Sequence, residues 1–270
     1  MALAGFSSML TGGCASPRGG SPSRGESERP PAAELHVATR DQVAPTGKSS
    51  GGRVVVELFS SEGCSSCPPA DTLLAELSGA SRDDGAIVVG LEHHVDYWDR
   101  LGWRDPFSSS ASTERQARYA SARSSDSIFT PEAVVDGVTS LVGSQRGALD
   151  EAIGARATKP ELSIRARLAH GAHGAPTVHV ELDAAPARPA DLVVAITESG
   201  LATAVPAGEN AGSTLQHGPI VRSLRAVGEA QAGAFDVALE PGSMGARRAI
   251  VVFVQTRPQG QILGGIRVVP

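Results

Sequence analysis

Residues 53–79 read RVVVELFSSEGCSSCPPADTLLAELSG, and this stretch decides the expected fold. The β-branched run at its start predicts a buried strand that ends at the Ser and Gly residues before Cys64. Two prolines after Cys67 and apolar residues at helical spacing predict a helix that ends near Gly79. The CxxC motif therefore lies where a buried strand leads into the N-terminus of a helix.

Similar patterns continue along the chain. Strands are predicted at residues 86–91, 133–135 and 139–142, and helices at residues 112–122 and 145–157. The predicted order is strand, helix, strand, helix, strand, strand, helix. We therefore expect residues 53–158 to form an α/β domain.

The pattern changes at residue 159. Apolar and polar residues alternate over residues 162–168 and 178–182, and apolar runs of strand length occur at residues 192–197 and 249–254. Short strands separated by Gly and Pro turns are typical of an all-β sandwich. Residues 159–270 are accordingly predicted to form a β-sandwich-like C-terminal domain.

The composition limits the class of protein. Of the 270 residues, 41% are hydrophobic, which is enough for large cores and excludes wholesale disorder. A net charge of −5 gives no excess of basic residues, so nucleic acid is not an expected partner. Apolar runs such as residues 249–254 are far shorter than the roughly 20 residues of a membrane-spanning helix.

The N-terminal region resembles a processing signal followed by a tether. Small and apolar residues precede Cys14, as at the end of a bacterial lipoprotein signal, so residues 1–14 are interpreted as a signal or leader. We expect a periplasmic protein, or one anchored to a membrane by lipidation of Cys14, or otherwise a secreted one. The alternative is that Cys14 is a free thiol. Residues 15–52 are rich in Gly, Pro and Ser, lack aromatic residues, and predict a disordered linker.

Four strings of residues carry a resemblance to a known family. They are VELFSSEGCSSCPPAD at 56–71, HVDYWDRLGWRDPF at 94–107, FTPEAVVDG at 129–137 and GENAGSTLQH at 208–217. They resemble the DUF1223 family, bacterial thioredoxin-like secreted or periplasmic proteins of unknown function. The resemblance covers residues 53–270 and implies a thioredoxin-like α/β domain followed by the all-β domain. Because the family has no assigned reaction, the resemblance indicates a fold more than a function.

The cysteine pair is the candidate catalytic centre. A helix N-terminus stabilises a thiolate, which is the nucleophile in thiol–disulfide exchange, and we place Cys64 in that position. Cys67 follows almost one turn later and is the predicted resolving thiol. The thioredoxin resemblance implies a third site residue, Pro131, which would form a cis Thr130–Pro131 bond opposite the motif and present backbone to a substrate.

The pattern predicts a thiol–disulfide oxidoreductase, or a redox partner of another protein, whose substrate is a thiol- or disulfide-containing protein. No cofactor is expected. One alternative is a protein that handles a soft metal such as Cu(I) through Cys64, Cys67 and His94. The other is a non-catalytic interaction module with a structural disulfide.

Other polar residues near the motif are given modest roles. His94 or Asp96 could approach the cysteines, but the favoured interpretation is that the aromatic residues beside them pack an insertion. Glu62 and Asp71 are interpreted as solvated carboxylates at the helix start.

The last third of the chain offers no convincing catalytic cluster. Asn210 and His217 are interpreted as structural loop residues. His170, His173, His179 and His217 are too scattered in the sequence to predict a metal site.

Limited proteolysis tests the predicted tether. If residues 15–52 are a linker, a protease should trim the chain to a stable fragment that starts near Arg53, because exposed Gly- and Pro-rich segments are cut first. Mass spectrometry of the fragment gives its first residue. Protection of residues 15–52 equal to that of the remaining chain would contradict the prediction.

Overall fold

The computed structural model describes residues 52–125, 127–159, 162–170 and 175–270. The predicted signal with Cys14, and nearly all of the predicted linker, lie outside these residues. Within them, no helix is long and apolar enough to cross a membrane.

The N-terminal half of the described chain has the element order that the sequence predicts. Its elements are β1 (Arg53–Ser60), α1 (Pro68–Leu77), β2 (Ile87–His94), α2 (Ser110–Ala122), β3 (Glu132–Val135), β4 (Thr139–Val142) and α3 (Arg146–Ala157).

In the C-terminal half, all of the described regular elements are strands. They are β5 (Ile164–His170), β6 (Pro176–Leu182), β7 (Ala190–Glu198), β8 (Ala202–Ala204), β9 (Thr214–Gln216), β10 (Ile220–Glu229), β11 (Gly233–Ala238), β12 (Arg248–Thr256) and β13 (Ile262–Val268).

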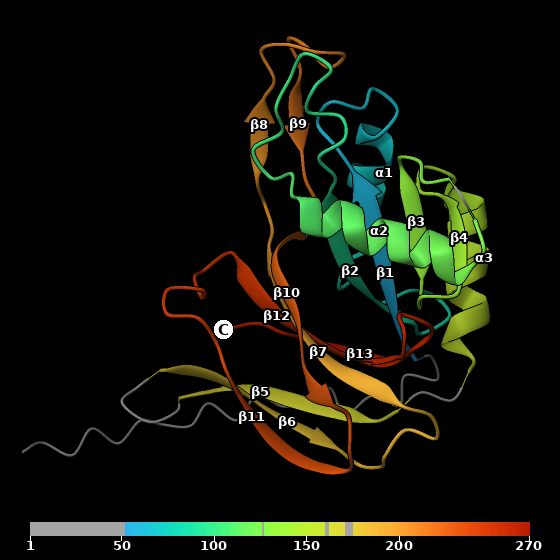
Figure 1. Cartoon of the computed structure of the whole chain (residues 1–270), viewed down its shortest axis with the longest axis vertical. Coiled ribbons are helices and arrows are strands. Elements are labelled where there is room, and N and C mark those ends of the chain that lie inside the picture. The colour runs from blue at the N-terminus through green and yellow to red at the C-terminus, as the bar shows by residue number, and fades with distance from the viewer. Residues whose placement is uncertain (1–51, 126, 160–161, 171–174) are drawn as a thin grey trace, which may run out of the picture. The chain divides into compact units, whose positions relative to one another are not determined.

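The expected fold class is wrong. The protein is mostly β, and one mixed eight-stranded sheet, ordered β13-β12-β7-β10-β2-β1-β3-β4, takes strands from both halves (Figure 1). It is therefore not a thioredoxin-like α/β domain followed by a separate β-sandwich. The predicted domain boundary between residues 158 and 159 stays a prediction. The eight-stranded sheet takes strands from both sides of that boundary.

The two halves of the sheet join at one short parallel contact. β10 pairs with β2 through Ile220 and Glu92, and the Glu92 N–H donates to the carbonyl of Pro219 at 2.9 Å. This contact gives the edge of β2 a hydrogen-bonding partner, which a buried edge requires. The sequence pattern predicted a strand at β2 but neither β10 nor this pairing, because strand pairing leaves no local signal.

The sheet also curls so that its far strands pack over its centre. Val55 of β1 and Leu91 of β2 share a hydrophobic core with Val193 of β7 and Phe253 of β12. β13 approaches β1 closely, since a Cβ on Gly265 would lie 2.5 Å from a methyl group of Val55. Both halves of the chain thus contribute to one core.

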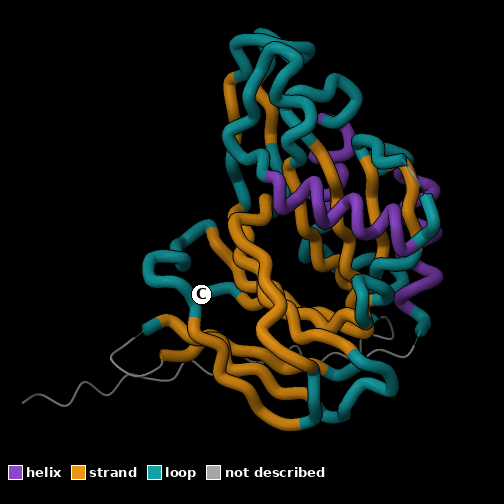
Figure 2. Tube along the Cα trace, viewed as in Figure 1, coloured by secondary structure: helices purple, strands orange, loops and turns teal. Residues whose placement is uncertain are grey.

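Successive side chains of β1 point to opposite faces of the sheet, and each set packs against different helices. Val54, Val56 and Leu58 point toward α1 and α3, where they form a second core. Glu57 and Phe59 point to the opposite face, where both contact Tyr119 of α2. Among the strands, β1 to β4 lie beside these helices, as Figure 2 shows, and the strands of the C-terminal half extend away from them.

Two smaller sheets complete the structure. β11, β6 and β5 form an antiparallel sheet that shares a core with β7 and β12. β8 and β9 form a two-stranded ladder, and the loop between them reaches the CxxC motif.

Gly265→Ala tests the close approach of β13 to β1. The added methyl group must displace Val55, so we expect a loss of about 1–3 kcal/mol in the free energy of unfolding, measured by urea denaturation. Gly147→Ala is the control, because nothing lies within 4 Å of its added Cβ. That variant should stay within about 1 kcal/mol of wild type, on the stabilising side. If both variants were equally stable, the close approach of Gly265 to Val55 would be contradicted.

Candidate functional site

The cysteine motif forms a buried disulfide at the start of α1. Cys64 and Cys67 are bonded, their Cα atoms lie 5.4 Å apart, and neither side chain is exposed. Cys67, rather than Cys64, occupies the N-cap position. Pro68 and Pro69 begin the helix and have no N–H to donate. The helix amides therefore do not surround the Cys64 sulfur in the way that the sequence suggested.

A threonine hydroxyl takes the place of those amides. Thr130 Oγ1 accepts a hydrogen bond from Trp98 Nε1 at 2.9 Å and donates to Cys64 Sγ at 3.3 Å. The Thr130–Pro131 peptide bond is cis, and Pro131 is buried. The residue pair that the thioredoxin resemblance implied is thus next to the first cysteine, with Trp98 behind it.

The loop between β8 and β9, residues 205–213, holds the CxxC turn from the outside. Asn210 Nδ2 donates to the carbonyl of Glu62 at 2.8 Å and to that of Cys64 at 3.1 Å. Glu209 accepts from the N–H of Ser65 at 3.0 Å. Asn210 is therefore more than the general loop residue expected from sequence, because it ties this loop to the disulfide.

Two carboxylates beside the motif are buried, although the sequence interpretation placed them in solvent. Asp71 is 1% exposed and accepts a hydrogen bond from the Ser60 hydroxyl. Its burial, and next the charge of Glu92, raise the pKa of Asp71 well above its usual value. Glu62 is equally buried and accepts from Trp103 Nε1 at 2.7 Å.

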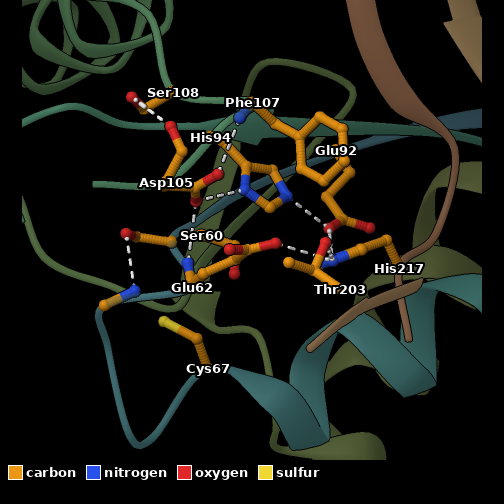
Figure 3. Close-up of polar contacts among 12 residues, drawn as sticks. Ser60, Glu62, Cys67, Glu92, His94, Asp105, Phe107, Ser108, Thr203 and His217 are labelled. Atoms are coloured by element: carbon orange, nitrogen blue, oxygen red, sulfur yellow. Dashed lines mark hydrogen bonds and ion pairs between the residues drawn. The ribbon is translucent and has the colours of Figure 1, made fainter. Parts of the chain in front are cut away.

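Behind the disulfide loop, His94 lies between two carboxylates (Figure 3). Its Nδ1 is 2.6 Å from Asp105 Oδ2, and its Nε2 is 2.7 Å from Glu92 Oε1. Burial lowers the pKa of His94, but the two carboxylates outweigh it and raise that pKa well above its usual value. Burial raises the pKa of Glu92, and its interactions with His217 and His94 outweigh it and lower that pKa to about 2.

His217 completes this buried cluster from the segment after β9. Its Nε2 is 3.1 Å from Glu62 Oε1 and its Nδ1 is 3.6 Å from Glu92 Oε1. Burial lowers the pKa of His217, but interactions with Glu62 and Glu92 outweigh it and raise that pKa to about 9. Glu62 therefore connects the disulfide loop to the histidines.

The proposed copper ligands are not brought together. Among the described residues, the group of side chains spaced to hold a metal ion is Glu92, His94 and His217, without a cysteine. Of the other histidines, His179 lies on the three-stranded sheet between Asp236 and Glu181. His173 lies outside the described residues.

Asp96 and Tyr97 face α2 rather than the disulfide. The Asp96 carboxylate accepts from the Thr113 hydroxyl at 2.6 Å, and the Tyr97 hydroxyl donates to Gln116 at 3.2 Å. These contacts agree with the interpretation that this segment packs an insertion.

A second buried network fixes α2 to the sheet. Glu57 accepts from Arg115 Nη2 at 2.8 Å and lies 3.0 Å from His93 Nε2, and the Tyr119 hydroxyl also donates to it. Burial raises the pKa of Glu57, but the Arg115 guanidinium outweighs it and holds that pKa well below its usual range. His93 therefore belongs to this network and not to the histidine cluster.

Most of the chain matches one protein family. The model of a family described as "Protein of unknown function (DUF1223)" matches residues 55–255. The chain belongs to the DUF1223 family. The resemblance seen in the sequence is confirmed, but its thioredoxin-like part is not, and its periplasmic part stays a prediction.

This DUF1223 member is also similar to a solved structure. A crystal structure of protein AGR_C_4864 from Agrobacterium tumefaciens is 28% identical to it, with a TM-score of 0.61. The match covers 82% of this chain and 94% of that one. No curated protein matches the chain.

Sequence reasoning missed most of the buried cluster. Sequence reasoning gave Glu92 and Asp105 no role and His217 only a structural loop role, although Asp105 and His217 lie in strings that carry the DUF1223 resemblance. Those strings were the available signal. Spacing alone could not join residues that are so far apart in the chain.

Asp71→Asn tests the buried carboxyl group. Because the folded pKa of Asp71 is raised, the unfolded state binds fewer protons above pH 4, and stability falls as the pH rises toward the folded pKa. The Asn side chain cannot ionise. The stability of Asp71→Asn relative to wild type should therefore rise by at least about 1 kcal/mol between pH 4 and pH 7, measured by urea denaturation.

Asp83→Asn, at an exposed position, is the control and should show no such change. A constant difference between Asp71→Asn and wild type over this pH range would contradict the raised pKa.

Proposed function

We propose that this protein carries out thiol–disulfide exchange with a protein partner through Cys64 and Cys67. The observation that carries the proposal is the disulfide beside the Thr130 hydroxyl, which donates to Cys64 Sγ at 3.3 Å. A hydrogen bond to sulfur favours the thiolate over the thiol once the disulfide is reduced. For Cys67, by contrast, no such donor is found among the described residues.

The asymmetry gives the two cysteines different roles. The Cys64 thiolate attacks one sulfur of a partner disulfide, forming a mixed disulfide and releasing one partner thiolate. Cys67, three residues away, then attacks Cys64 Sγ, which closes the intramolecular disulfide and releases the second partner thiolate. The partner disulfide is reduced and the dithiol oxidised. The same steps in reverse oxidise a partner dithiol, and the reduction potentials of the pair and its partner set the direction.

Access to the sulfurs depends on the 205–213 loop. Both cysteines are fully buried, whereas Ser65 and Ser66 between them are exposed. Asn210 and Glu209 hold the turn by three hydrogen bonds to backbone groups. We expect a partner to displace these bonds, and its own backbone and side chains to replace them.

The predicted export supports this proposal, because disulfides persist in the periplasm and outside the cell. The rival function is an interaction module with an inert disulfide. Reactivity of the cysteines separates the two.

Trapping of mixed disulfides tests the proposed roles in a Cys14→Ser background, so that only the motif reacts. Cys67→Ser should accumulate mixed disulfides with a model disulfide-containing protein, because no resolving thiol remains. Cys64→Ser should form few. Non-reducing electrophoresis and mass spectrometry measure both. In the reduced protein, iodoacetamide should label Cys64 before Cys67.

Thr130→Val is the matched variant, because it keeps the shape of the side chain and removes the donor to Cys64. It should slow the labelling of Cys64 and leave that of Cys67 unchanged. Equal, slow labelling of both thiols, or a disulfide that resists dithiothreitol in the folded protein, would overturn the proposal in favour of a structural disulfide.

A further inference from the structure

Three buried side chains behind the disulfide loop converge on one point. Glu92 and His94 are two residues apart on β2, so they lie on the same face of the strand. His217 joins them from the segment after β9. One potential ligand atom from each residue lies within 4.8 Å of the others, and all three side chains are fully buried. Figure 3 draws the contacts among them.

The outer nitrogen of each imidazole is paired with its own carboxylate. His94 Nδ1 lies 2.6 Å from Asp105 Oδ2. His217 Nε2 lies 3.1 Å from Glu62 Oε1 and shares a hydrogen bond of 3.3 Å with Thr203 Oγ1. Histidines that bind metals almost always place the ring nitrogen away from the metal against such a carboxylate or another acceptor. This arrangement directs His94 Nε2 and His217 Nδ1 toward Glu92.

One of these inward nitrogens has no hydrogen-bond partner. His217 Nδ1 is buried and unsatisfied, and its nearest carboxylate oxygen, on Glu92, is 3.6 Å away. A buried polar atom without a partner costs about 1–3 kcal/mol, so its place among two other ligand atoms points to a missing ligand. A metal ion bound to this nitrogen would remove that cost.

The charge around the three residues also fits a cation. Glu62, Glu92 and Asp105 are carboxylates within one buried cluster, and the two histidines would bind a metal as neutral imidazoles. A divalent cation would replace the positive charge that the two imidazoles give up when they bind it as neutral rings. The nearby Phe107 ring packs edge-on against both imidazoles, with centroids 5.5 and 5.2 Å away, and closes that side.

We propose that Glu92, His94 and His217 form a binding site for a divalent transition-metal ion of the zinc class. Two imidazole nitrogens and one carboxylate oxygen suit such ions, and three protein ligands leave a further coordination position open. Asp105 and Glu62 orient the imidazoles. The site does not depend on the proposed thiol–disulfide exchange, because no cysteine contributes a ligand.

Metal titration tests the proposal on the full chain with its disulfide intact and Cys14 alkylated. After chelator treatment and dialysis, the protein should bind one equivalent of Zn²⁺ in equilibrium dialysis. Co²⁺ should bind competitively and give the visible absorption of a low-coordinate nitrogen and oxygen site. Because this sample has no free thiol, cysteine thiolate cannot account for the metal that it binds.

Substitutions distinguish the residues that bind the metal from the carboxylates that orient them, by their effect on Zn²⁺ affinity. Asp105→Asn should weaken Zn²⁺ binding by about 10- to 100-fold, and His217→Gln and Glu92→Gln should each weaken it further. His179→Gln is the matched control, since this histidine also lies between two carboxylates, at 2.7 and 3.3 Å, but on the protein surface. It should bind like wild type.

Two outcomes would overturn the site. One is the absence of stoichiometric Zn²⁺ and Co²⁺ binding by the wild-type protein, which would leave the cluster a network of ion pairs. The other is equal binding by wild type and by folded His217→Gln. If the ligand variants fail to fold, the cobalt spectrum of the wild-type protein still decides, because it reports the ligand atoms directly.

Discussion

The structure depends on one constraint: the carboxylates buried within β1 and β2 must each find a partner. Glu57 is paired by Arg115 of α2, and Glu92 by His94 and by the backbone N–H of Gly218. An unpaired buried charge is strongly destabilising, so these pairings decide which elements come together. They bring α2 onto one face of the sheet and the segment after β9 onto the end of β2.

Glu62 links the disulfide to the histidine cluster. Its carbonyl accepts from Asn210, its N–H donates to Asp105 at 2.8 Å, and its carboxylate contacts Trp103 and His217. A change of geometry at the neighbouring cysteines must therefore act on groups that position both imidazoles. The proposed exchange site and the proposed metal site use different side chains, but Glu62 contacts residues of both.

The continuous sheet explains how distant segments supply one site. Because β10 joins β2 beside Glu92, the chain just before β10 must pass the end of β2. That passage places His217 against Glu92 and carries the 205–213 loop over the CxxC turn. The separate C-terminal domain that the sequence suggested does not by itself predict these contacts, because they depend on the pairing of β10 with β2.

The sequence by itself determined the local elements and the chemistry of the motif. β-branched runs, helical spacing and the two prolines after Cys67 act over a few residues, so they predicted β1, α1 and the element order through α3. The resemblance also led to Pro131. Only the tertiary structure decided that Glu62 and Asp71 are buried, that β10 pairs with β2, and that His217 meets Glu92. These features arise from packing between distant segments, and such packing has no periodicity that a single sequence can show.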